Sequence, residues 1–255
     1  MNDALYIAAT GMHAHQKSVE AVANNLANVN TPGFKAGKTT FVDLVYRGLQ
    51  PAAAGGPEVW QGSGVSVADI TRSFAPGELR RTEQALDIAI DGEGFIEVGE
   101  AAGATLYTRG GSLKVNADGL LATADGYPLK PAIHVGQDVR TLTIGPDGTV
   151  SVASGKQERP VEVGKIELVR FADLSGLAPM GGNLYRPTER SGDAIYGRSG
   201  EDGAGQLVQG ALEASNVKLI DEMVGLMAAQ RAYESSVKVI QAADEMLAMS
   251  NNLRK

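Results

Sequence analysis

The sequence predicts an α+β fold, with a helical domain built from both ends of the chain and an all-β domain inserted between them. Apolar residues recur with heptad spacing near each end, while the middle alternates apolar and polar residues between glycine-containing turns. The 32 glycines and the aromatic content of only 5% fit a turn-rich β region. We expect a discontinuous, coiled-coil-like helical domain (1–35 and 210–255), an extended connection (36–81) and a β-rich domain (82–209).

The first helix is expected from about Asp3 to Val29, with Asn2 or Asp3 as its cap. Pro32 and Gly33 end it, because the residue before a proline is disfavoured in the α region. Its length is roughly 40 Å at 1.5 Å per residue. One apolar seam, interrupted by His15, runs along it through Leu5, Ala8, Met12, Val19, Val22, Leu26 and Val29.

The connection is expected to be extended or flexible, because residues 51–57 and 61–64 are rich in Pro, Gly and Ala. In the central region, alternation over Leu86, Ile88 and Ile90, a break at 91–94 and renewed alternation at 95–98 predict strand, turn and strand. Turns are also predicted at 116–119, 124–126 and 146–148, and a further strand at 165–171.

The last helix is predicted from a second heptad-like seam, with Asp221 and Glu222 in its first turn and Arg254 and Lys255 at its end, as the helix dipole favours. The seam consists of Leu219, Met223, Leu226, Tyr233, Val237, Ile240 and Leu247. Three further apolar residues, Ile220, Val224 and Met227, widen this stripe. They predict either a wider contact within the chain or contacts with other subunits.

Four asparagines, Asn24, Asn25, Asn28 and Asn30, lie near the end of the first helix although Asn is a poor helix former. They either fray and terminate the helix or set the register of packed helices through buried hydrogen bonds. The candidate subunit-packing residues combine the two seams with three of these asparagines: Leu5, Met12, Val19, Leu26, Asn24, Asn25, Asn28, Leu219, Met223, Leu226, Tyr233, Val237, Ile240 and Leu247.

Composition and motifs argue against several kinds of chemistry. A net charge of −7 disfavours nucleic-acid and anionic-membrane partners, and the absence of cysteine excludes disulfides and thiolate metal sites. The segment Gly33–Thr39 is one residue too short for a phosphate-binding loop, and Gly92–Gly94 lacks the third glycine of a dinucleotide fingerprint. We therefore expect no catalytic residues, cofactor, metal or small-molecule substrate, and neither a cleaved signal peptide nor a membrane span.

Six segments carry a resemblance to a known family. Residues 23–35 (ANNLANVNTPGFK) resemble the signature of flagellar rod and hook proteins, and residues 210–217 and 227–234 resemble the C-terminal signature of that family. Residues 86–95, 107–112 and 182–185 resemble its central region, so the resemblance covers essentially the whole chain. Length and the connection around residues 50–65 favour the distal rod over the proximal rod, and the single modest β insert disfavours the hook.

The resemblance implies a non-enzymatic subunit that polymerises into a tubular drive shaft and transmits torque from motor to hook. Terminal helices would form the inner tube, and the β domain would face the surrounding ring bushing. Implied partners are further copies, other rod and hook-type proteins, the bushing and the flagellar type III export apparatus, in a rod crossing the periplasm. The connection would stiffen the tube, although residues 51–56 depart toward Ala and Gly.

Three alternatives remain open at the level of sequence: a proximal rod or hook-type subunit, a periplasmic enzyme acting on the cell wall, and an adaptor that pairs its helices internally.

Overall fold

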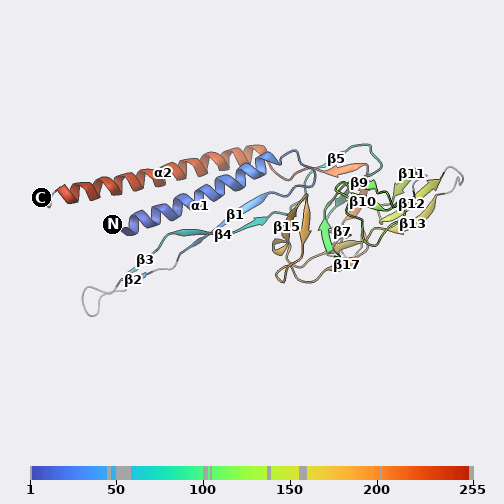
Figure 1. Cartoon of the computed structure of the whole chain (residues 1–255), viewed down its shortest axis with the longest axis horizontal. Coiled ribbons are helices and arrows are strands. Elements are labelled where there is room, and N and C mark those ends of the chain that lie inside the picture. Colours follow the sequence, from blue (N-terminus) through green and yellow to red (C-terminus); the bar gives the residue numbers. More distant parts are fainter. Residues whose placement is uncertain are drawn as a thin grey trace. The chain divides into compact units, whose positions relative to one another are not determined.

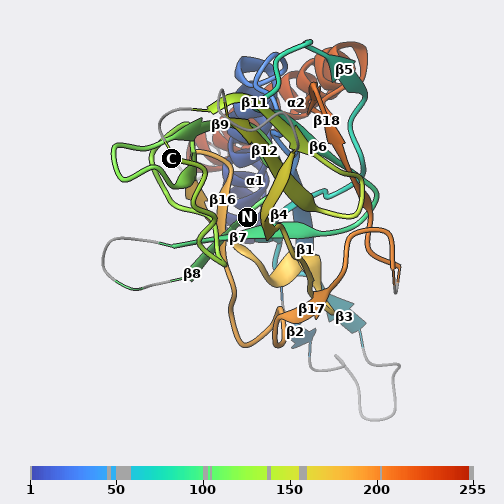
Figure 2. The same cartoon turned by 90° about the vertical axis from the view of Figure 1, so that its right-hand side faces the viewer.

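The computed structural model describes residues 2–44, 47–49, 59–99, 103, 105–136, 139–154, 160–201 and 203–252. The chain forms two compact units, shown with their elements in Figures 1 and 2. The helical unit contains residues 1–27, 37–72 and 218–255, and the β unit contains residues 28–36 and 73–217. The α+β architecture predicted from the sequence, with terminal helices packed together and a central region of several sheets, is confirmed.

Two long antiparallel helices dominate the helical unit, α1 (Asn2–Ala27) and α2 (Leu219–Asn252). Strands β1 (Gly37–Asp43) and β4 (Val65–Arg72) form an antiparallel ribbon that packs against α1. A shorter antiparallel pair joins β2 (Arg47–Leu49) to β3 (Val59–Gln61). The segment expected as an extended connection thus contains paired strands, and its residues 51–57 lie outside the described part of the chain.

Two larger sheets form the body of the β unit. The first has the order β10 (Leu121–Thr123), β9 (Gly110–Val115), β6 (Asp87–Asp91), β18 (Gln206–Gln209). The second has the order β15 (Ala178–Gly181), β16 (Leu184–Arg186), β8 (Thr105–Thr108), β7 (Phe95–Gly99), β14 (Leu168–Arg170), β17 (Ile195–Gly197).

Smaller elements complete the β unit. Strands β11 (Val139–Ile144), β12 (Thr149–Ser154) and β13 (Val161–Lys165) form a meander, and β19 (Ala211–Glu213) pairs with β5 (Leu79–Arg81). A short 3-10 helix, η1, spans Leu174–Gly176.

The β unit has an aliphatic core and a separate aromatic cluster. Apolar side chains from both larger sheets and from the meander, including Ile88, Leu121 and Val150, are completely or almost completely buried. Phe95, Tyr107, Phe171 and Tyr185 pack mostly edge-to-face in the aromatic cluster. Strands β6 and β7 and the turn between them lie where the sequence predicted them, but nearly all of their residues are buried, on both faces of the strands.

The ends of several helices and strands differ from those predicted from the local sequence. Helix α1 ends at Ala27, two residues before the predicted end, and a turn follows it. The single strand predicted over 165–171 is instead the end of β13 and a separate β14, which pair with different strands. The acidic first turn of α2 is present as predicted, whereas Arg254 and Lys255 lie outside the described residues.

No helix in the described part of the chain is both long and apolar enough to span a membrane.

Candidate assembly surface

Helices α1 and α2 meet through small side chains. The buried apolar residues of the pair are all alanines, namely Ala8, Ala14, Ala21, Ala229 and Ala243. A Cβ placed on Gly11 would lie 3.6 Å from Oγ of Ser236. Small residues therefore let the two backbones approach closely.

The larger residues of the predicted seams are incompletely buried within the chain. On α1, Leu5, Met12, Val19 and Leu26 are all half-buried. On α2, Leu226, Val237, Ile240 and Leu247 are half-buried, whereas Leu219, Met223 and Tyr233 are exposed. The structure thus brings the two seams onto one helix pair but leaves much of their apolar surface uncovered.

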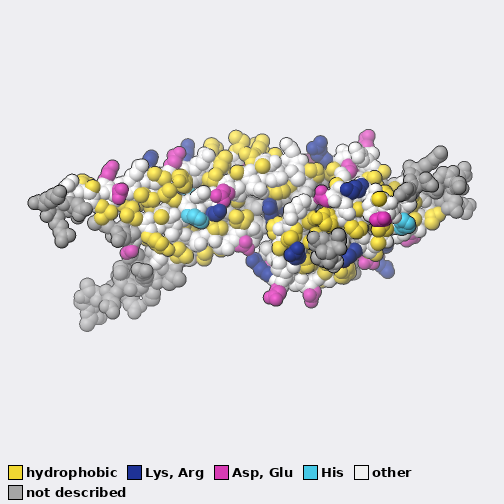
Figure 3. All heavy atoms as spheres, viewed as in Figure 1, with side chains coloured by type: hydrophobic (Ala, Val, Ile, Leu, Met, Phe, Trp, Pro, Cys, Tyr) yellow, Lys and Arg dark blue, Asp and Glu magenta, His cyan; other side chains and the backbone are white. Residues whose placement is uncertain are grey.

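An apolar row marks the first turns of α2 and consists of Leu219, Ile220, Met223, Val224 and Met227. Their spacing places them on one side of the helix, and the exposed fraction of Ile220 reaches 75%. Figure 3 shows apolar side chains along the exposed surface of the helical unit. An exposed row of this size on a helix marks a surface for protein contacts more often than an isolated apolar residue does.

Asn25 is the one member of the asparagine cluster that is fully buried, with an exposed fraction of 2%. Its Oδ1 accepts a hydrogen bond of 2.8 Å from the backbone N–H of Gly37, and its Nδ2 donates one of 2.8 Å to the Gly37 carbonyl. The same Nδ2 lies 3.1 Å from Oε1 of Glu222 on α2. Asn25 thereby ties α1 to both β1 and α2, which fits the register-setting interpretation at this position.

The other asparagines occupy different environments. Asn24 and Asn30 are exposed, and Asn28 is half-buried. Oδ1 of Asn28 accepts a hydrogen bond of 3.2 Å from the hydroxyl of Thr31, within the turn that follows α1. Asn28 therefore contributes to the turn.

A buried charged cluster in the β unit was not predicted from the sequence. Nζ of Lys35 lies 2.6 Å from Oε1 of Glu213, and Nε of Arg109 lies 3.3 Å from Oε2 of the same carboxylate. The three side chains are at most 4% exposed. Each belongs to a different segment that carries the family resemblance, which was the available sequence signal.

The carboxylate of Glu213 is held in its charged form by this cluster. Burial alone would raise its pKa, but the positive charge of Arg109 and the hydrogen bonds from Lys35 and the Gly77 N–H lower the pKa of Glu213 below its ordinary value. Glu213 is thus the anion shared by two buried cations, an arrangement that offsets part of the cost of burying charge.

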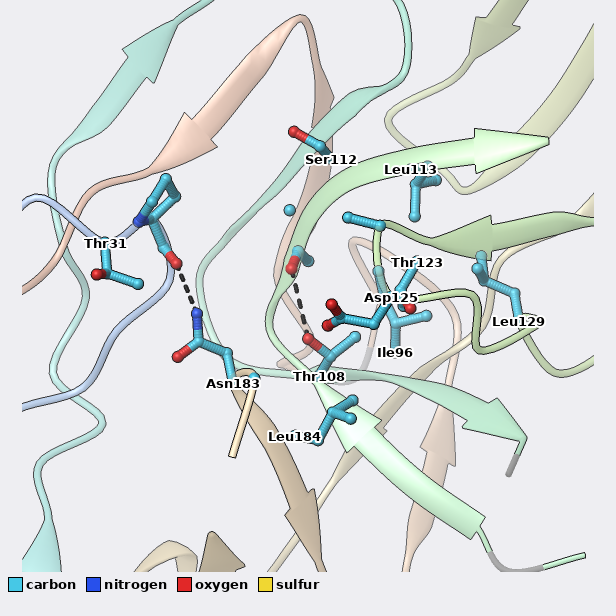
Figure 4. Close-up of a pocket in the computed structure, with 15 residues that line it drawn as sticks. Thr31, Ile96, Thr108, Ser112, Leu113, Thr123, Asp125, Leu129, Asn183 and Leu184 are labelled. Atoms are coloured by element: carbon cyan, nitrogen blue, oxygen red, sulfur yellow. Dashed lines mark hydrogen bonds between the residues drawn. The ribbon is translucent and has the colours of Figure 1, made fainter. Parts of the chain in front are cut away.

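A hollow of about 290 Å³ lies in the β unit next to the turn that follows α1 (Figure 4). In its wall, Nδ2 of Asn183 donates a hydrogen bond of 2.7 Å to the carbonyl of Pro32. Asp125 is the one ionisable residue among the fifteen that line it. The lining therefore supplies no acid–base pair and no nucleophile beside a base.

Metal ligands are likewise not gathered in the described residues, where no three His, Cys, Asp or Glu side chains form a group that could hold an ion. Paired long helices that carry an exposed apolar row are typical of the class of structural assembly proteins.

Comparison with known protein families places the chain within this class. Residues 5–35 match the family described as flagella basal body rod protein, residues 89–152 the flagellar hook protein FlgE/F/G D1 domain, and residues 208–253 the flagellar basal body rod FlgEFG protein C-terminal region. The three matches cover most of α1, the stretch from within β6 to within β12, and the whole of α2.

Curated relatives match over nearly the full length. The flagellar basal-body rod protein FlgG of Borreliella burgdorferi is 41% identical, with 100% of each chain covered. FlgG of Caulobacter vibrioides is 39% identical over 98% of this chain and 99% of the relative. FlgF of the same organism is 35% identical over 96% of this chain and 95% of the relative.

The chain belongs to the flagellar basal-body rod protein family, whose members are structural and not catalytic. It is a homologue of FlgG, the distal rod protein.

Proposed function

We propose that this distal rod subunit polymerises through its terminal helices into a tube that transmits torque from the flagellar motor to the hook. The exposed apolar row of α2 carries the proposal, since these side chains are left uncovered by α1. Head-to-tail contacts between identical subunits generate a helical filament when the rotation between neighbours does not close into a ring.

A second feature of the helical unit supports self-association. A groove of about 470 Å³ lies between the early turns of α1, the middle of α2 and the start of β4. Ala, Gly, Ser, Ile and Val line it, without any charged residue. Both the groove and the apolar row would gain from burial against a neighbouring copy, since removal of apolar surface from water is favourable.

The partners and the location follow from family membership as proposals. We infer that the subunit contacts other rod and hook-type proteins at the ends of its segment, and the surrounding ring bushing through its β unit. We place the assembled rod across the periplasm, with the flagellar type III apparatus as its export route.

The assembly surface can be tested by placing a charge in it. We expect Ile220→Asp and Met223→Asp, two members of the apolar row, to prevent filament formation, because burial of an unpaired charge in a packed apolar contact costs several kcal/mol. Exposed Gln241 on the same helix supplies the control, Gln241→Asp, which should assemble normally. Electron microscopy and sedimentation would follow assembly, and near-UV circular dichroism would report whether the β unit remains folded.

Intact filaments from both charged variants would contradict this assignment of the surface. Ile220→Asp is the more selective variant, because the exposed fraction of Ile220 in the single chain is 75%, whereas that of Met223 is 52%.

A position elsewhere in the rod, like that of a FlgF-type subunit, is the second candidate, because the FlgF relative matches at 35% identity over 96% of the chain. Labelled subunits located by electron microscopy within purified basal bodies would distinguish the two positions.

A further inference from the structure

Four segments of the β unit that are far apart in sequence are joined around Glu213. The chain passes between its two units after Ala27, Ala36, Arg72 and Val217. Three segments of the β unit adjoin these passages, namely 28–36, 73–77 and 213–217. Each of these three segments is hydrogen-bonded to the other two, and Arg109 comes from a fourth segment.

The segments 28–36 and 73–77 are joined to each other first. Nζ of Lys35 donates a hydrogen bond of 2.9 Å to the carbonyl of Ala75, and the N–H of Ser73 donates one of 2.8 Å to the carbonyl of Ala36.

The segment 213–217 is bonded to both of them. Oδ1 of Asn216 accepts from the N–H of Ala36 at 2.8 Å, and its Nδ2 donates to the carbonyls of Ser73 and Ala75 at 2.7 and 3.0 Å. The carbonyl of Glu213 accepts from the N–H of Gly33 at 2.7 Å.

The Glu213 side chain closes the arrangement. Its Oε1 accepts from the N–H of Gly77 at 2.8 Å and from Nζ of Lys35 at 2.6 Å. The three segments therefore form a closed triangle of bonds, and a force that displaces one segment must strain its bonds to both of the others.

Arg109 fastens this triangle to the body of the β unit. Its Nη1 and Nη2 donate to the carbonyls of Gly94 and Gly92 at 3.1 and 2.9 Å, in the turn between β6 and β7. Its Nε lies 3.3 Å from Oε2 of Glu213. The guanidinium also lies 5.8 Å from the centroid of the Phe95 ring, in the aromatic cluster.

We propose that Lys35, Arg109, Glu213 and Asn216 form a mechanical clamp that makes the chain segments at the passages bear load together and transfers that load to the core of the β unit. The proposal rests on the proposed function in assuming that load reaches the subunit through its helices. Hydrogen bonds loaded in parallel resist separation better than the same bonds broken one after another, and the buried ions of the clamp are shielded from competing water.

Glu213→Gln tests the clamp because it keeps the size of the side chain and removes the shared anion. We expect the amides of Gly33, Ala36 and Ser73 to exchange hydrogen roughly 100-fold faster or more, since removing one partner of a buried charge pair is strongly destabilising. The core amides of Leu121 and Ile166, which donate to Ile133 and Gly148, should remain far better protected than the passage amides.

The matched control is Glu97→Gln. Glu97 belongs to the same unit, its side chain is 13% exposed, and it lies 3.7 Å from Lys130, away from the passages. We expect little change at the three passage amides in this variant. Unchanged exchange there in Glu213→Gln, or an equal rise at passage and core amides, would overturn the clamp.

A force measurement separates a mechanical role from stabilisation alone. The chain has no cysteine, so attachment points can be introduced at two exposed positions of the β unit, Asn30→Cys and Asp118→Cys. Pulling between them on the full chain loads the segment 28–36 against the body of the unit. We expect a lower force for the first rupture in Glu213→Gln than in the background chain or in Glu97→Gln.

Lys35→Met provides a second variant for the case in which Glu213→Gln does not fold. It removes the bonds to Ala75 and Glu213 while Arg109 still neutralises the carboxylate. A rupture force equal to that of the background chain would overturn the proposal. These measurements use unassembled subunits, so they are independent of the filament assays. If the clamp variants behave like the background chain while the filament assays come out as expected, the clamp is refuted and the proposed function stands. If the clamp variants are weakened as expected while the charged variants of α2 still form filaments, the proposed function is refuted and the clamp stands.

Discussion

Replacement of Asn25 by alanine should destabilise the helical unit selectively. The change removes the partner of both the N–H and the carbonyl of Gly37 and the contact with Glu222. Gly37 and Glu222 are half-buried, so we assign about 1 kcal/mol to each backbone group and about 0.5 kcal/mol to the third contact. The expected loss is about 2–3 kcal/mol, which is about a 30- to 150-fold change in the unfolding equilibrium constant.

This loss can be measured by urea unfolding, followed by the far-UV circular dichroism signal of α-helices. The signal reports on the helical unit because α1 and α2 are the long helices of the described chain. Asn24→Ala is the matched control, since Asn24 is the preceding residue on the same helix and is exposed. We expect the control to lose less than about 1 kcal/mol, as is usual for surface substitutions. Equal losses in the two variants would refute the argument that Asn25 sets the register of the helix pair.

Three further outcomes follow from other positions. The lowered pKa of Glu213 means that the folded state binds fewer protons than the unfolded state, so its stabilising contribution is present above the ordinary pKa of 4.5 and is lost as pH falls through the folded pKa. The difference in free energy of unfolding between the wild type and Glu213→Gln should therefore shrink in urea titrations below that pH. Gly77→Ala should cost about 1–3 kcal/mol in thermal unfolding, because its Cβ would lie 2.0 Å from the Ala214 carbonyl oxygen. Gly197→Ala, with 3.9 Å to the nearest atom, is the matched control and should be nearly neutral. Gly225→Ala should stabilise α2 by about 0.5–1 kcal/mol in the same assay, because alanine is the better helix former and the nearest side-chain atom would be 3.9 Å away; a loss of stability would contradict that account.

The two terminal helices were predictable from the sequence because heptad spacing is a local signal that extends over many residues. Which apolar residues they bury was not predictable in the same way. Ala14 and Ala21 lie outside the predicted seam, yet they are buried, while Met223 and Tyr233 lie in it and are exposed. The seam pattern identifies the apolar side of a helix, whereas burial depends on how closely the partner backbone approaches.

The buried charged cluster escaped prediction for a different reason. Lysine is rarely buried without a partner, so Lys35 at the end of a Pro-Gly-Phe turn is expected at the surface from local sequence. Its partner Glu213 lies 178 residues away, and nothing in the spacing of the two residues indicates the contact. The segments that carry the family resemblance did mark all three members of the cluster, although the resemblance alone did not indicate that the segments meet.

The incomplete burial of α2 also bears on how the subunit divides its free energy between folding and association. Each of the five side chains in the apolar row keeps about half or more of its surface in water. Full burial of such a side chain is worth about 1.5–3 kcal/mol, so about 1 kcal/mol remains unrealised at each position and about 5 kcal/mol in the row. That amount is comparable to the whole stability of a marginal domain, about 5–15 kcal/mol. If the row is buried against neighbouring subunits, a subunit that leaves the filament loses this burial. The free energy lost is then similar in size to the free energy that keeps a small domain folded.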